Sequence, residues 1–106
     1  MNRTRIKQTF ADYTNKYNAS DPKIRLKIDH TYRVAALAER IARTVTDIPI
    51  DRDLAWTMGM LHDIGRFEQV KRYGTFVDSE SIDHAELGIT ILFEEGLLTQ
   101  FGDCLL

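Results

Sequence analysis

The sequence predicts an all-α fold, a helical bundle of about five helices, and three observations support this prediction. Apolar residues recur every three or four positions along most of the chain, which is the period of an α-helix. No segment alternates apolar and polar residues for long enough to indicate a strand. Two prolines and six glycines punctuate these helical stretches. With 106 residues, 43% of them hydrophobic, the chain is expected to form one domain with a buried core.

The first two predicted helices occupy the basic N-terminal part of the chain. The first covers about residues 3–17, where apolar side chains recur at helical spacing: Ile6, Phe10, Tyr13 and Tyr17. Ser20-Asp21-Pro22 then provides a capping side chain followed by a proline suited to a first helical turn. The second helix continues to about Val45. Its apolar stripe leads back at helical spacing to a histidine: Ile41, Leu37, Val34 and His30.

Three more helical segments are predicted after Ile48-Pro49-Ile50. Asp51 can cap a helix over about residues 52–64, and this helix is apolar on nearly every side, so we expect it to be central and buried. Gly65 is expected to end it in a left-handed conformation. A short helix at 67–73 precedes a turn at Gly74 and an acidic loop through Asp83. The last helix is expected at about 82–95 and is closed by Gly96.

Charge is distributed unevenly along the chain. Residues 1–43 carry ten Lys or Arg and four Asp or Glu, whereas the remainder carries four and twelve. Either two solvated helix faces differ in sign, or the basic half attracts a phosphorylated substrate while the acidic half holds a cation. The basic residues are not interleaved with aromatic ones, which disfavours nucleic acid as a partner.

Cellular location is predicted from what the sequence lacks. The apolar runs are too short for a membrane helix, and the basic N-terminus has no apolar segment of a secretory signal behind it. The single cysteine, Cys104, excludes an internal disulfide and suits a reducing compartment. We therefore expect a cytoplasmic protein with no membrane partner.

The three histidines of the chain each lie on a predicted helix, on a face shared with apolar or small residues. His62 and Asp63 fall at the end of a helix, where the last turn loosens and free carbonyls favour a cation. His84 shares its face with Leu87, Gly88 and Ile91. Taken singly, a histidine is more often a core or surface residue. Taken together, His30, His62, Asp63 and His84 predict a metal site, and such a site indicates hydrolysis. Asp29 and Asp83 precede histidines but face other directions, so we expect both to be solvated.

From about Lys27 to Leu98 the chain resembles the HD superfamily of metal-dependent phosphohydrolases. Three blocks carry the resemblance: Lys27-Ile28-Asp29-His30-Thr31, Leu61-His62-Asp63-Ile64-Gly65-Arg66-Phe67 and Asp83-His84-Ala85-Glu86-Leu87-Gly88. The resemblance implies that His30, His62 and Asp63 bind a divalent ion and that His84 serves a second, with Asp63 able to bridge two. The ligands suit Mn, Fe, Ni, Co, Zn or Mg without choosing among them. Asp63 and Arg66 are the implied catalytic residues, with Arg66 on a phosphate oxygen. The alternative for Arg66 is a surface arginine after a helix.

One departure from the family pattern concerns the last ligand, an aspartate on a helix further downstream. No histidine follows His84, and the later Asp103 is a poor match. We therefore expect residues 1–106 to be a single, truncated HD domain whose C-terminal helices are missing. The predicted function is hydrolysis of a phosphate ester such as a nucleotide, with a small phosphorylated substrate as partner. The alternative is a non-catalytic truncated helical module that acts through oligomer contacts, as a homodimer or a helix-exchanged oligomer.

Overall fold

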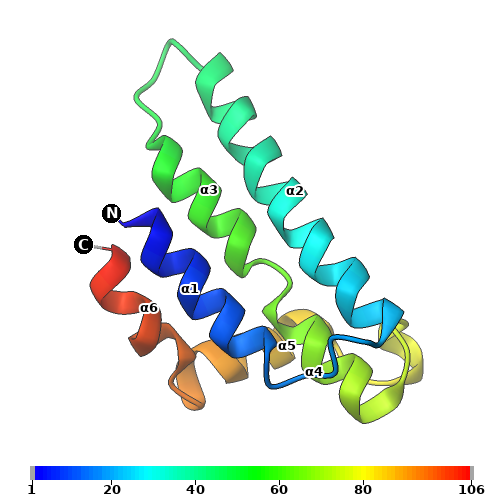
Figure 1. Cartoon of the computed structure of the whole chain (residues 1–106). Helices are drawn as coiled ribbons and strands as arrows, with labels where there is room; N and C mark the ends of the chain where they lie inside the picture. The colour runs from blue at the N-terminus through cyan, green and yellow to red at the C-terminus, as the bar shows by residue number, and fades with distance from the viewer. Residues whose placement is uncertain (1, 106) are drawn as a thin grey trace.

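The computed structural model describes residues 2–105, with side chains described through residue 102, and this part of the chain is all-α (Figure 1). Its α-helices are α1 (Arg3–Thr14), α2 (Pro22–Thr44), α3 (Arg52–Leu61), α4 (Ile64–Tyr73), α5 (His84–Ile89) and α6 (Leu97–Leu105). A 3-10 turn at Asp78–Glu80 precedes α5, and a π-helical turn at Thr90–Glu94 follows it. The all-α prediction is confirmed, with α6 as an additional helix. None of the described helices is long and apolar enough to span a bilayer.

Helices α2 and α3 lie side by side and form the upper part of the molecule in Figure 1. Both begin at the predicted caps: Asp21 accepts a hydrogen bond from the backbone of Lys23, and Asp51 accepts one from Leu54. Small residues allow the close approach, because a Cβ atom at Gly59 would lie 2.5 Å from Cα of Ala35. This contact places the middle of α2 beside the last turn of α3.

The faces of α2 and α3 that are buried differ from the predicted ones. Leu37 is 52% exposed and Ile41 is also exposed, so the large apolar stripe of α2 is not its core face. The buried residues of α2 are Ile24, Thr31, Ala35 and Ala42. Helix α3 is not buried on every side, since Met58 is 64% exposed. The two helices meet through small residues, and several large apolar side chains, among them Leu37, Ile41 and Met58, lie outside this contact.

The hydrophobic core is formed mainly where α1, α4 and α6 meet the end of α3. Phe67 of α4 is fully buried at its centre, with ring centroids 5.9 Å from Phe10 and 6.1 Å from Tyr13 in edge-on geometry. The other fully buried apolar side chains include Ile6, Met60, Ile64 and Phe101. Helix α6 packs on α1, so the two ends of the described chain lie near each other (Figure 1). The side chains of Asp103 and Cys104 lie outside the described ones.

The predicted third helix is interrupted, and Gly65 does not end it. Helix α3 stops at Leu61, and α4 begins at Ile64 and runs through the predicted 67–73 segment. Positive φ angles occur at Gly74, where a turn was predicted, and at Gly96, which was predicted to close a helix, and not at Gly65. Gly65 instead lies in the first turn of α4, where a Cβ atom would be 2.1 Å from the backbone oxygen of His84. Because Gly65 has no side chain, α5 can pack closely against α4.

Candidate metal centre

The four predicted metal ligands come together where α2, the α3–α4 break and α5 meet. His30 lies on α2, His62 and Asp63 occupy the break, and His84 begins α5. Oδ2 of the buried Asp63 carboxylate is 3.4 Å from Nε2 of His30 and 3.2 Å from Nε2 of His62. Its Oδ1 is 3.6 Å from Nε2 of His84. One carboxylate thus faces three imidazole rings, and each ring presents the same nitrogen to it.

The break between α3 and α4 explains how adjacent residues can face each other. Successive side chains on a continuous helix diverge by about 100°. Asp63 has φ −116° and ψ 23°, outside helical geometry, while His62, the C-cap that follows α3, still has helical angles. The interruption turns the two side chains toward one another. From the sequence we expected the side chains of His62 and Asp63 to converge at a loosened helix end. In the structure they converge because the chain breaks between two separate helices.

The hydrogen bonds of the histidines determine which ring nitrogens are free. Nδ1 of His62 bonds the backbone oxygen of Gly59, and Nδ1 of His84 bonds Oδ2 of Asp78 at 2.8 Å. Because both partners are acceptors, each Nδ1 must carry a proton. In the neutral ring each Nε2 then presents a lone pair to an oxygen of Asp63. Two acceptors face each other in this way only with a cation or an added proton between them. The donor set therefore fits a divalent ion.

The surroundings of Asp63 favour its ionised form. Burial disfavours its charged form, but the hydrogen bond and charge of His62 and the charge of Lys27 outweigh burial and hold the pKa of Asp63 well below its usual range. The hydrogen bond to Asp63 raises the pKa of His62. Burial and the nearby Lys27 lower the pKa of His30. The carboxylate of Asp63 is therefore ionised at neutral pH, and its negative charge interacts with His62 and Lys27.

The ligand atoms of His30, His62 and Asp63 lie within 4.8 Å of one another, and the same holds for a second group, Asp78, Asp83 and His84. Both oxygens of Asp78 already accept hydrogen bonds. The donors are Nδ1 of His84, Nε2 of Gln69 at 2.9 Å and Nη1 of Arg66 at 2.9 Å. The hydrogen bonds from His84 and Gln69 lower the pKa of Asp78 to about 2. Asp83 is exposed, as predicted, and caps α5. This group supports His84 and is not a free set of ligands.

Arg66 belongs to the hydrogen-bonded group around Asp78 that holds His84, and it is not a surface arginine. Its side chain is 18% exposed, and Nη1 also donates to the backbone oxygen of Phe76 at 2.7 Å and to Gln69 at 3.0 Å. Arg66 thus fixes the loop between α4 and α5 at the carboxylate that holds His84. Its predicted contact with a phosphate oxygen stays a prediction.

Sequence reasoning missed two groups at the centre, Lys27 and Asp78. Nζ of Lys27 lies 3.4 Å from Oδ2 of Asp63. Its position three residues before His30, one helical turn away, was a usable signal. Asp78 begins the 3-10 turn between α4 and α5, and no regular helical spacing relates it to His84.

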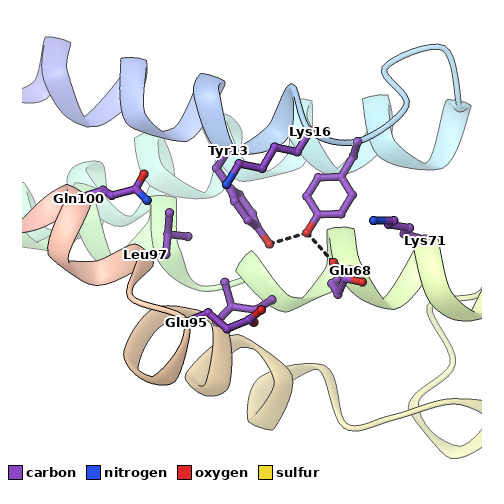
Figure 2. A pocket seen from close by; sticks show the side chains of 9 residues that line it. Tyr13, Lys16, Glu68, Lys71, Glu95, Leu97 and Gln100 are labelled. Atoms are coloured by element: carbon purple, nitrogen blue, oxygen red, sulfur yellow. Dashed lines mark hydrogen bonds between the residues drawn. The ribbon is translucent and has the colours of Figure 1, made fainter.

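A separate cavity of about 250 Å³ lies between α1, α4, the π-helical turn and α6 (Figure 2). None of the four predicted ligands lines it. In its wall, Tyr17 donates to Oε1 of Glu68 at 2.9 Å and lies 3.0 Å from the hydroxyl of Tyr13. Tyr13 donates to the backbone oxygen of Ile64, the residue after Asp63. Burial raises the pKa of Tyr13 to about 12, so this hydroxyl keeps its proton at neutral pH and braces the start of α4.

Comparison with known families connects this geometry to one of them. The HD domain family matches residues 28–104, which is more than half of the chain and includes all four predicted ligands. Comparison with curated proteins and with solved structures found no match. The sequence resemblance, the all-α fold and the family match agree, and the chain belongs to the HD domain family.

Proposed function

We propose that this chain provides the metal centre of a phosphohydrolase that acts on a phosphate ester such as a nucleotide. One observation carries the proposal. The Nε2 atoms of His62 and His84, each with its Nδ1 already hydrogen-bonded, face opposite oxygens of the Asp63 carboxylate. Mixed imidazole and carboxylate ligands suit Mn, Fe, Ni, Co or Zn, and Mg where oxygen ligands dominate. Membership of the HD domain family supports the reaction class.

The chain's own residues would divide the work at this centre. His30, His62 and Oδ2 of Asp63 would hold one ion, and His84 with Oδ1 would serve a second. Divalent ions in such a site lower the pKa of water and stabilise charge on a phosphoryl group. Gly59 and Asp78 keep the ligand nitrogens aimed by fixing the tautomers of His62 and His84.

Metal analysis tests the proposal directly. Protein purified without chelator, or titrated with Mn²⁺ by calorimetry, should bind the ion in the wild type and lose most binding in His62→Ala and Asp63→Ala. Asp29→Ala is the matched control, because Asp29 is exposed, directly precedes His30 and belongs to neither group of possible ligands. It should bind as the wild type does. Equal metal content in all four proteins would refute the metal centre.

An activity measurement then tests the reaction class. Hydrolysis of nucleotides and of a generic phosphate ester in the presence of Mn²⁺ should depend on His62 and Asp63 and be unaffected by Asp29→Ala. Metal binding without hydrolysis of any phosphate ester would limit the proposal to a binding centre.

A second candidate is a helical module that acts through contacts between copies of the chain. The observation that favours it is the group of large apolar side chains exposed on α2 and α3: Leu37, Ile41, Leu54 and Met58. Light scattering should then give a dimer mass that falls to the monomer mass in Met58→Lys. A monomer at all concentrations would remove this candidate.

A further inference from the structure

Lys27 occupies the centre without belonging to the predicted ligand set. Its side chain is 17% exposed, and its Nζ lies 3.4 Å from Oδ2 of Asp63 and 5.1 Å from the centroid of the Phe76 ring. The ammonium therefore sits beside the oxygen that His30 and His62 also face. Lys27 precedes the residues that match the HD domain family, so that match assigns it no role.

This position conflicts with an ion held by the same oxygen. A divalent cation bound by Oδ2 and the two histidines would have the ammonium as a close neighbour, and two cations repel strongly at a partly buried site. Lys27 would therefore move away from Asp63 when the centre is loaded. The flexible four-carbon stem of lysine allows such a movement.

The ammonium then needs another anion near the centre. Of the two other carboxylates there, Asp78 is already paired with Arg66 and His84, and Asp83 caps α5. The ring of Phe76 favours a cation close by and keeps Lys27 at the edge of the centre. In Arg66, Nη1 is already shared among Gln69 on α4 and two acceptors on the loop, Phe76 and Asp78, so Nη1 is not free to contact a phosphate, whereas the buried Nε has no hydrogen-bond partner among the described residues. A phosphate group brought to the metal would supply the missing anion.

We propose that Lys27 is a phosphate-binding residue: it neutralises Asp63 in the metal-free protein and contacts a phosphate oxygen in the metal-loaded protein. This inference rests on the proposed metal centre. It predicts opposite effects of one substitution on two ligands, because the same charge opposes the metal and attracts the phosphate.

Lys27→Met tests the inference, since methionine keeps an unbranched apolar side chain beside Phe76 and removes the charge. Calorimetry of the whole chain should show Mn²⁺ bound about threefold more tightly or better, because a competing cation is gone. Inorganic phosphate should bind the Mn²⁺-loaded variant about tenfold more weakly, because a charge-assisted contact is lost. Lys16→Met, at a lysine that lines the separate cavity, should change neither affinity.

Several results would overturn the inference. Unchanged phosphate affinity in Lys27→Met, with metal binding intact, would remove the role of Lys27 and leave the metal centre standing. A loaded wild type that binds no phosphate would do the same. If Lys27→Met binds both Mn²⁺ and phosphate more weakly, Lys27→Arg decides between the explanations. Recovery of phosphate binding in Lys27→Arg supports the role of the charge, and no recovery overturns the inference. A wild type without Mn²⁺ affinity overturns the metal centre and this inference together, and the His62→Ala comparison identifies that case.

Discussion

The contact between α4 and α5 at Gly65 gives a quantitative prediction for Gly65→Ala. The added Cβ atom would lie 2.1 Å from the backbone oxygen of His84 and 2.7 Å from the backbone nitrogen of Gly88. Cβ atoms essentially never come closer than 3.0 Å to such atoms, so the shorter distance must grow by about 0.9 Å. Both neighbours are backbone atoms. No side-chain rotation can relieve the collision, and α5 has to move away from α4.

Two opposing terms set the size of the effect on stability. Alanine stabilises a helix by about 1 kcal/mol relative to glycine. Overpacking of a close contact costs about 1–3 kcal/mol, and a rigid backbone neighbour favours the upper end of that range. We therefore expect Gly65→Ala to lower the free energy of unfolding by about 1–2 kcal/mol. The movement of α5 should also lengthen the distance from His84 to Asp63, now 3.6 Å, and weaken metal binding that uses His84.

Urea unfolding followed by circular dichroism measures the first effect, and Mn²⁺ calorimetry measures the second. Gly102→Ala is the control, because a Cβ atom at this position of α6 meets nothing within 4 Å. It should leave metal binding unchanged and stability equal or higher. If Gly65→Ala matched the wild type in both measurements, the close approach of α4 and α5 would not be what positions His84.

Two further predictions concern the hydrogen bonds around the centre. The pKa of Asp78 is about 2 when folded and ordinarily 3.8, so its stabilising effect is complete above about pH 4 and is lost as the pH falls toward 2. Asp78→Asn should therefore flatten this part of the stability curve, measured by urea unfolding at several pH values, and parallel curves would contradict the assignment. Tyr17→Phe should cost about 1 kcal/mol, since Glu68 loses a half-buried donor. An unchanged unfolding midpoint would show that water replaces the hydroxyl.

The helices, and the residues that come together at the candidate metal centre, were predictable largely from local sequence. Asp21 and Asp51 cap the helices that follow them, as side chains of this kind do when the next residues are helical. The histidines could be assigned to one centre because each shares a helical face with small or apolar residues. The adjacent pair His62-Asp63 linked them to one centre. On a continuous helix these two side chains would point in different directions, so the pair indicated that a helix ends there.

Other features depend on tertiary contacts and could not be read from the sequence. Periodicity shows which residues share a face of α2, but not whether that face meets a partner. The contact between Ala35 and Gly59 decided this, and it left Leu37 outside. In the same way, the role of Gly65 followed from the approach of α5 and not from its own neighbours in the sequence.

Helix α1 lies before the residues that match the HD domain family, yet the core is built on it. Ile6 and Phe10 are almost completely shielded from water, and the hydroxyl of Tyr13 reaches the backbone next to Asp63. A gene shortened to encode only the matched segment would therefore produce a polypeptide with Phe67 uncovered. We expect such a product to aggregate during expression, and domain boundaries for this protein are better drawn from its packing than from the extent of a family match.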